Sequence, residues 1–490
     1  MSQVEIKRKA ITGALWSFCE RFGSLIILFF ANVVLARLLT PDDYGLVAIL
    51  LTFVAFFQIL IDGGFGSAIV QKKDLTSDDC STVFYINIFV AIFCYMLLVF
   101  SSEYIAGCFK QSQLINLIPI LGLVVVFDAL SAIQNNILIK ELNFKKISII
   151  KIIAALISSS AAIIIAIKGF GVWALVAQYL LNSVMKSLLL WGRTKWIPSL
   201  TFKKESFNSL FNYGSKLLIS NVIFEAYYRL QVFILGWFFP PRIVGLYSQA
   251  KHLQDVPVST MQSVVNQVTF PVFSKLQDDY NQLRNVVSRN IQLISYLITP
   301  VMLMMVATAT PLVELMFGEK WLDCVPYLQV LCIGIGVFYP IHSANHNVIK
   351  AIGRTDLLLI IEIIKRIIGI GLILSAIIYG FGIMGVLYAI TISTLIEFVI
   401  NAFVVGKCIR YTIFMQVKDV IVPFFISCVA GFCVYWMQSQ LQLTNILALF
   451  SQVICFCIIY LIMSKVMRLN SFEYLIDILK ELKQKRAIKK

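Results

Sequence analysis

Long apolar stretches separated by short polar connections run along the whole chain. A membrane-spanning helix needs about 20 apolar residues, and about fourteen stretches reach that length. The expected spans are 12–39, 44–68, 81–101, 114–138, 147–167, 172–191, 210–238, 245–271, 287–309, 325–349, 357–379, 383–406, 417–437 and 446–466. Because the connections are short, no extramembrane domain large enough for separate chemistry is expected. The pattern predicts an all-α polytopic membrane protein.

An internal repeat relates the first six spans to the next six. TPDDYGLVA follows the first span and FPPRIVGLYS follows the seventh, so that Pro41 and Gly45 recur as Pro241 and Gly245. Two further pairs of segments match at an offset of 211 in residue number. They are NILIKELNFKKISII with NVIKAIGRTDLLLII, and KGFGVWALVA with YGFGIMGVLY. Since six spans separate the copies, both begin on the same side of the membrane and the repeat is parallel.

The repeat divides the chain into four predicted regions. We expect a six-helix lobe at 1–195, a second six-helix lobe at 206–411, two further transmembrane helices at 412–466, and a basic amphipathic tail at 467–490. The tail would lie as a helix on the anionic leaflet, and a solvated, partly disordered tail is the open alternative. A cleft between two such lobes is where a transported molecule would bind.

The distribution of basic residues predicts the orientation. With fourteen spans both termini lie on one side, whose segments hold about 28 Lys and Arg residues against about 5 in the opposite loops. The positive-inside rule therefore places both termini in the cytoplasm. The chain is therefore expected to be a multi-pass membrane protein with a cytoplasmic N-terminus and C-terminus.

Composition supports the membrane class and excludes others. Hydrophobic residues make up 59% of the 490 residues and charged residues 14%, whereas soluble domains have about 25% charged residues. The excess of 41 Lys and Arg over 26 Asp and Glu fits anionic lipids of the inner leaflet, and no nucleic-acid partner is expected. The eleven cysteines lie mostly in apolar stretches, as core residues do.

Charged side chains occur inside several spans, where exposure to lipid is costly. Glu20 and Arg21 lie in the first span, Asp128 in the fourth and Glu397 in the twelfth. Three further sets of polar and charged residues each follow one face of an expected helix. They are Asn221, Glu225 and Arg229 in the seventh span; Ser248, Lys251, His252, Asp255, Ser259, Gln262 and Asn266 in the eighth; and Glu362, Lys365 and Arg366 in the eleventh. Such stripes indicate a polar interior surface rather than contact with lipid.

Structural roles compete with functional ones at several of these positions. The i,i+4 pair Glu225 and Arg229 can neutralise itself inside a helix interface. Lys151, Lys186 and Lys216 lie near cytoplasmic helix ends, where snorkelling explains them, so they are left out of the site. His342 and His346 have a spacing that suits a metal, yet no third ligand is visible, so we interpret them as polar cavity lining. IDGGFGSA lacks the preceding strand and the spacing of a phosphate loop, and indicates a helix end or a close backbone contact.

The first 90 residues carry a family resemblance. ALWSFCERFGSLIILFFANVVLARLLTPDDYGLVAIL, IDGGFGSAIVQKKD and STVFYINIF resemble the opening of the Wzx-type polysaccharide transporters of the multidrug, oligosaccharidyl-lipid and polysaccharide (MOP) superfamily. The likeness is closest to the lipopolysaccharide, colanic-acid and teichuronic-acid export branch. It implies a flippase, not an enzyme, that moves an undecaprenyl-diphosphate-linked oligosaccharide between leaflets by alternating access.

The resemblance and the charges together define a predicted site. Cations in a wet cleft would compensate the diphosphate through charge-assisted hydrogen bonds. The candidates for this role are Arg21, Arg229, Lys251, Lys365 and Arg366. The candidates for ion coupling or cavity lining are Glu20, Asp128, Glu225, Asp255, His342, His346, Glu362 and Glu397. No cofactor or bound metal is expected; the partners would be the lipid-linked oligosaccharide, anionic lipids, H⁺ or Na⁺, and the polysaccharide polymerase machinery.

Two other functions stay open at the sequence level. A multidrug or cation antiporter of the same superfamily would favour acidic residues, whereas the candidates here are at least as basic as acidic. A membrane polysaccharide polymerase would need carboxylates, Arg or His in a sizeable external loop, and the external loops are short and nearly uncharged.

Overall fold

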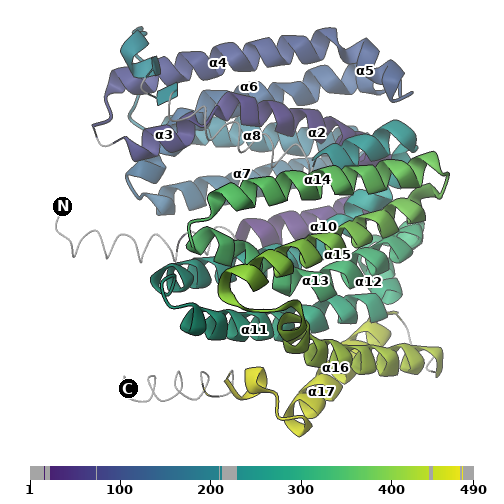
Figure 1. The fold of residues 1–490 in the computed structure, drawn as a ribbon. Helices are drawn as coiled ribbons and strands as arrows, with labels where there is room; N and C mark the ends of the chain where they lie inside the picture. The colour runs from purple at the N-terminus through teal and green to yellow at the C-terminus, as the bar shows by residue number, and fades with distance from the viewer. Residues whose placement is uncertain are drawn as a thin grey trace, which may run out of the picture. The chain divides into compact units, whose positions relative to one another are not determined.

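The computed structural model describes residue 16 and residues 23–72, 74–208, 210–211, 229–440, 445–474 and 477, and in these ranges all regular structure is helical (Figure 1). The chain forms two compact units, Met1–Ser248 and Gln249–Lys490. The boundary between these two units differs from the boundaries of the four regions predicted from the repeat, and those regions stay a prediction.

The first unit contains seven numbered helices between two shorter apolar ones, Gly23–Leu38 and Arg229–Phe238, in its described part. They are α2 (Pro41–Asp62), α3 (Phe65–Gln71), α4 (Ser77–Phe100), α5 (Ser102–Cys108), α6 (Leu114–Lys140), α7 (Phe144–Ile167) and α8 (Trp173–Arg193). Helices α2 and α4 both begin with a capping box, in which a threonine and an aspartate three residues later satisfy each other's backbone N–H groups.

Helix α10 (Pro241–Lys275) begins in the first unit and continues in the second. The second unit then contains α11 (Tyr280–Ala307), α12 (Ala309–Phe317), η1 (Glu319–Cys324), α13 (Val325–Ala351), α14 (Thr355–Ile378), α15 (Gly382–Ile409), α16 (Ile413–Gln440) and α17 (Asn445–Val466). A large apolar core joins α10, α11, α13, α15 and α16, and a second core joins α11, α16 and α17.

The predicted spans correspond to helices. Within the described residues ten helical segments are long and apolar enough to cross a membrane. Helices α10 and α14 are also long, at 35 and 24 residues, but carry the charged positions noted above. With the two shorter apolar helices, each of the fourteen expected spans contains a helix, so the prediction of an all-α polytopic fold is confirmed.

The IDGGFGSA segment ends a helix, as the sequence indicates. Helix α2 stops at Asp62, and Gly63 and Gly64 have φ angles of 53° and 73°, which L side chains rarely adopt. Helix α3 starts directly after them, so the expected span at 44–68 is interrupted rather than continuous.

Matched helices pack alike in the two units. Adding 211 to the bounds of α6 and α7 gives the bounds of α13 and α14. Helix α6 packs on α4 and α8, and α7 packs on α8; equally, α13 packs on α11 and α15, and α14 packs on α15. The parallel repeat read from the sequence therefore appears as a repeated packing pattern.

The repeated proline and glycine mark a close contact between backbones. A Cβ atom added to Gly45 would lie 1.8 Å from the carbonyl oxygen of Pro241, and one added to Gly245 would lie 1.9 Å from that of Pro41. The first turns of α2 and α10 thus pass each other where only glycine leaves room.

Candidate functional site

Part of the predicted site lies outside the described residues. This holds for Glu20, Arg21 and Glu225, and for the side chains of Gln262 and Asn266. The other candidates are described. Arg229 begins the short apolar helix Arg229–Phe238. The rest fall into three groups: a cluster on α13, α14 and α15, a pair on α10, and Asp128 with its neighbours on α2 and α8.

The largest group joins three helices of the second unit. Glu362 on α14 binds both cations of its own helix, with Arg366 Nη2 at 2.8 Å from Glu362 Oε2 and Lys365 Nζ at 2.5 Å from Oε1. The i,i+3 and i,i+4 spacings place all three on one helix face. Arg366 Nη1 also lies 3.4 Å from Glu397 Oε1 on α15, so one guanidinium joins two carboxylates and two helices.

Two histidines of α13 complete this cluster. His346 Nδ1 lies 3.7 Å from Glu362 Oε1, and His342 Nδ1 lies 3.9 Å from Glu397 Oε2. Asn401 of α15, which sequence analysis did not select, has its side-chain nitrogen 2.9 Å from His342 Nδ1. In the described part of the chain, no three His, Cys, Asp or Glu side chains are grouped to hold a metal ion.

The cluster is buried and electrically balanced. The Lys365 side chain is 0% exposed, and those of Arg366 and Glu397 are each 13% exposed. Two cations face two carboxylates, so the net charge is zero while both histidines are neutral. Burial strengthens each attraction and makes any unpaired member costly. A change of one proton, or the arrival of an anion, would therefore disturb the whole cluster.

Helix α10 carries a more accessible ion pair. Lys251 Nζ lies 2.7 Å from Asp255 Oδ1 and 3.2 Å from Gln254 Oε1. The side chains of Lys251 and Asp255 are 27% and 49% exposed. An exposed i,i+4 pair contributes little to stability, so Lys251 can exchange its partner at low cost.

Asp128 of α6 is paired inside the first unit. Its carboxylate accepts hydrogen bonds from Ser183 Oγ at 2.6 Å and Gln58 Nε2 at 2.5 Å, and Lys186 Nζ lies 3.3 Å away. The sequence favours snorkelling for Lys186, whereas in the structure its ammonium lies beside Asp128 of a neighbouring helix. Gln58 and Ser183, on α2 and α8, were also missed.

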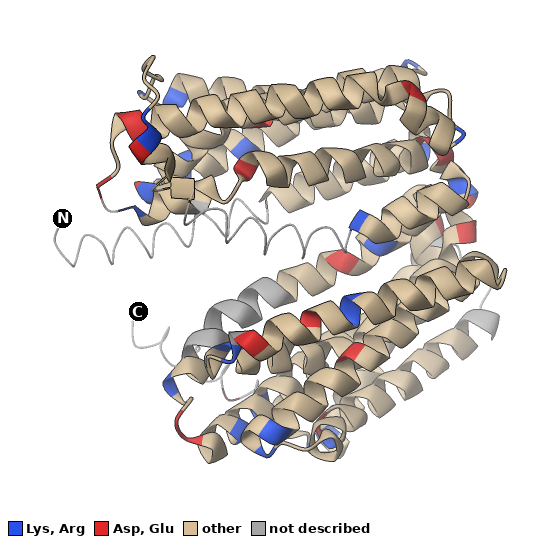
Figure 2. Cartoon of the chain, turned by 45° about the horizontal axis from the view of Figure 1, so that its top comes forward, with Lys and Arg blue, Asp and Glu red and all other residues tan. Residues whose placement is uncertain are grey.

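The matched helices carry opposite charges at equivalent positions. The separation of 211 residues relates Lys151 on α7 to Glu362 on α14, and Lys186 on α8 to Glu397 on α15. The sequence contains the signal for this inversion, because the same separation of 211 residues defines the repeat. Figure 2 shows Lys, Arg, Asp and Glu positions part-way along several helices, with uncharged residues on either side.

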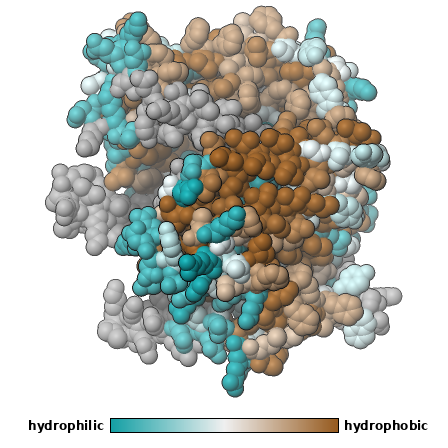
Figure 3. Space-filling view, viewed as in Figure 1, coloured by the Kyte–Doolittle hydropathy of each residue, from teal (hydrophilic) through white to brown (hydrophobic). Residues whose placement is uncertain are grey.

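The outer surface of the second unit contrasts with this cluster. Helix α14 exposes large apolar side chains on its other face, among them Leu359, Ile360, Ile363 and Ile367. Figure 3 shows a broad hydrophobic surface in the region of α14 and α15. One helix therefore presents apolar side chains outward and charged side chains inward, as a helix at the lipid boundary of a transporter does.

Comparison with known proteins places this arrangement in a class. The lipid II flippase MurJ in an inward closed conformation matches with a TM-score of 0.73 and 18% identity over 93% of this chain and 98% of that chain. An inward-facing MATE multidrug transporter of the MOP superfamily matches with a TM-score of 0.62 and 15% identity over 79% and 96%. The chain thus shares the all-helical fold of these two proteins.

Sequence comparison identifies the family. Residues 34–326 match the model of the polysaccharide biosynthesis protein family, to which the chain therefore belongs. The teichuronic acid biosynthesis protein TuaB of Bacillus subtilis is 25% identical over 439 residues, 89% of this chain and 90% of that protein. The lipopolysaccharide biosynthesis protein WzxC of Escherichia coli is 25% identical over 433 residues, 86% of each. The resemblance seen in the first 90 residues is confirmed.

Proposed function

We propose that the chain is a flippase that moves an undecaprenyl-diphosphate-linked oligosaccharide across the bacterial cytoplasmic membrane by alternating access. It would serve the synthesis of a capsule, O-antigen or exopolysaccharide. Family membership supports this proposal, together with relatives named for teichuronic acid and lipopolysaccharide biosynthesis and a fold shared with a lipid II flippase. The chain would act as a transporter and not as an enzyme.

The observation that carries the proposal is the buried charged cluster on α13, α14 and α15. A diphosphate that leaves the leaflet surface loses water, and a planar guanidinium compensates that loss with paired hydrogen bonds. Arg366 is the candidate in this cluster, Lys365 supports it, and Lys251 offers a more accessible cation. Arg229 and Arg21 are the corresponding candidates on the other spans.

The contacts of Arg366 suggest how an anion would enter. Its contact with Glu397 is 3.4 Å long, against 2.8 Å for its contact with Glu362. Glu397 is therefore the carboxylate that gives way most readily. Protonation of Glu397, with His342 beside it, would leave the cluster with a net positive charge and release one side of the guanidinium to the diphosphate. H⁺ is thus the proposed coupling ion, and Na⁺ bound between Glu362 and Glu397 is the alternative.

The test is surface delivery of a glycan in cells that lack their own flippase. We expect Arg366→Ala and Lys251→Ala to reduce delivery about tenfold or more, because a hydrogen bond to a charged group contributes about 1.5–3 kcal/mol. Arg366→Lys should retain part of the activity, since an ammonium lacks the planar fork. Lys168→Ala, at an exposed position between α7 and α8, is the matched control, and protein level is measured in the same membranes.

The same assay separates function from scaffolding. If Arg366 serves only to neutralise Glu397, then Arg366→Ala combined with Glu397→Ala should restore what Arg366→Ala alone destroys. Recovery in the double variant, or full delivery in both single variants, would refute a contact between Arg366 and the diphosphate.

A cation antiporter is the second candidate, favoured by the two buried carboxylates Glu362 and Glu397. Cells that express the chain would then resist cationic drugs and would not restore glycan delivery. Each carboxylate faces a cation in the structure, which leaves less negative charge for a drug than an antiporter would present.

A further inference from the structure

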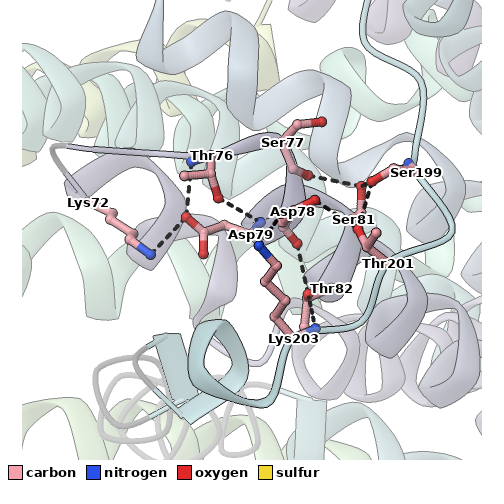
Figure 4. Close-up of polar contacts among 10 residues, drawn as sticks. All are labelled: Lys72, Thr76, Ser77, Asp78, Asp79, Ser81, Thr82, Ser199, Thr201 and Lys203. Atoms are coloured by element: carbon pink, nitrogen blue, oxygen red, sulfur yellow. Dashed lines mark hydrogen bonds and ion pairs between the residues drawn. The ribbon is translucent and has the colours of Figure 1, made fainter.

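The segment that follows α8 has no regular structure and crosses the start of α4. Residues 194–203 leave α8 at Arg193 and run past the first two turns of α4, where Ser77, Asp78, Ser81 and Thr82 lie (Figure 4). In the repeat read from the sequence, this segment belongs to the connection between the first lobe and the second.

Polar contacts fix alternate residues of the second half of the segment to α4. Ser199 donates its backbone N–H to Ser81 Oγ at 3.0 Å, and Thr201 Oγ1 donates to Asp78 Oδ1 at 2.9 Å. Lys203 donates its backbone N–H to Thr82 Oγ1 at 3.1 Å, and its Nζ lies 2.5 Å from Asp78 Oδ2. This carboxylate raises the pKa of the exposed Lys203 ammonium.

Aromatic residues fix the beginning of the segment as well. Trp196 donates its ring N–H to Ser77 Oγ at 3.3 Å, and its ring lies 5.8 Å from that of Phe84. Trp191, in the last turns of α8, packs on the same Phe84 and donates to the carbonyl of Leu130. The backbone of the segment is therefore held from both ends.

The residues between these contacts are apolar and exposed. Leu200 is 96% exposed, Phe202 is 61% exposed, and Ile197 is 73% exposed. Successive side chains of an extended chain point to opposite sides. Because Ser199, Thr201 and Lys203 contact α4, the side of the segment that faces away from α4 presents Leu200 and Phe202. A soluble protein arranges such a segment the other way round, with its apolar side chains inward.

Basic side chains surround the apolar face. Arg193, Lys195, Lys203 and Lys204 are all exposed. Among the nearby carboxylates, Asp78 pairs with Lys203 and Asp79 pairs with Lys72 at 2.7 Å. Glu205 is exposed and acts on Lys203, so the four cations exceed Asp78 and Glu205 by two charges. The surface therefore combines exposed Ile, Leu and Phe with an excess of positive charge.

We propose that residues 194–204 dock into the interfacial layer of an anionic bilayer. Leu200, Phe202 and Ile197 insert at the level of the head groups, and Lys195 and Lys204 contact anionic phosphates of phospholipids. Position supports a lipid partner, because the segment lies where the spanning helices α4 and α8 end, and hence where helices leave the hydrocarbon. Apolar side chains flanked by Lys and Arg are what binding to an anionic leaflet requires. The proposal does not depend on the transported molecule.

Photocrosslinking of the full chain tests the apolar half of the proposal. Benzoylphenylalanine would replace Leu200, Phe202 or Ile197 in separate variants, each reconstituted in nanodiscs of phosphatidylcholine and phosphatidylglycerol. After illumination, mass spectrometry should find phospholipid adducts at all three positions, several-fold above a control with the probe at Asp278, an exposed polar position between α10 and α11. A yield equal to that of the control, or crosslinks to protein in place of lipid, would overturn the proposal.

A charge variant tests the anionic preference. With the probe at Leu200, the ratio of phosphatidylglycerol to phosphatidylcholine adducts should exceed the ratio of the two lipids in the disc. Lys195→Gln with Lys204→Gln should lower that ratio at least twofold, because two cations are lost while the contacts to α4 remain. Lys168→Gln, which removes an exposed cation after α7, should leave it unchanged. An adduct ratio that follows disc composition in every variant would contradict the role of the lysines.

Discussion

At the scale of single residues, the second-unit cluster shows how buried charges depend on one another. Lys365 is fully buried and contacts Glu362, which also pairs with Arg366, while Arg366 pairs in addition with Glu397. Removing one charge leaves an odd number of buried charges, and breaking a buried pair costs about 3–5 kcal/mol. Removing the charges of Lys365 and Glu362 together leaves Arg366 and Glu397 as a complete pair.

We therefore expect Lys365→Met to lower the midpoint of thermal unfolding of the purified protein, and Lys365→Met with Glu362→Gln to recover most of the loss. The measurement is a melting curve in one detergent at one pH. Glu319→Gln, at an exposed position in η1, is the control and should leave the midpoint in place. A double variant less stable than Lys365→Met would mean that Glu362 is held by groups other than these cations.

At the scale of elements, the close crossing of α2 and α10 requires glycine at two positions. Replacing glycine by alanine inside a helix usually stabilises it by about 0.5–1 kcal/mol. At Gly45 and Gly245 the added methyl group would lie within 2 Å of a backbone carbonyl oxygen, which cannot rotate away as a side chain can. The steric cost must then exceed the gain.

Gly45→Ala and Gly245→Ala should each reduce the amount of folded protein and lower its unfolding midpoint. Gly107→Ala is the matched control, because a Cβ atom at this helical glycine of α5 meets nothing within 4 Å. It should leave the midpoint unchanged or raise it. The measurement is fluorescence-detected gel filtration of the solubilised protein after a temperature series. Equal behaviour of all three variants would show that the two helices can separate at the crossing.

The helices could be predicted from the sequence, whereas the side-chain contacts between them could not. Apolar stretches of about 20 residues determine a spanning helix locally, and the 211-residue repeat already contained the equivalence of α6 with α13. Contacts such as Gln58 with Asp128, or Asn401 with His342, join residues far apart in sequence and depend on how helices rotate against each other. Lys186 shows the limit, because a lysine near a helix end suits both snorkelling and a pair with Asp128.

At the scale of the whole molecule, the asymmetry of basic residues predicts which side of the membrane each connection faces. In a background without the eleven native cysteines, a cysteine at Ser112 should react with a membrane-impermeant reagent from outside intact cells. A cysteine at Asn143 should react only after the cells are opened. Both positions lie next to helix ends, before α6 and before α7. Labelling at Asn143 with protection at Ser112 would invert the topology and place the segment at 194–204 on the outer leaflet.

The proposed ion coupling belongs to the same scale, because it would link the charge of one cluster to the motion of the whole molecule. The cluster is balanced with Glu397 ionised, so under the proposed mechanism a proton on Glu397 would release Arg366 and let the cluster bind an anion. In proteoliposomes, an imposed pH gradient should accelerate translocation of the lipid-linked oligosaccharide by the native chain. Glu397→Gln, which resembles the protonated state permanently, should remove the response to the gradient, and Glu319→Gln should keep it. The readout is the amount of glycan accessible to an externally added glycosidase over time. Rates that are the same with and without the gradient in the native chain would exclude protons, and a repetition with a sodium gradient then tests whether Na⁺ acts at the same carboxylates.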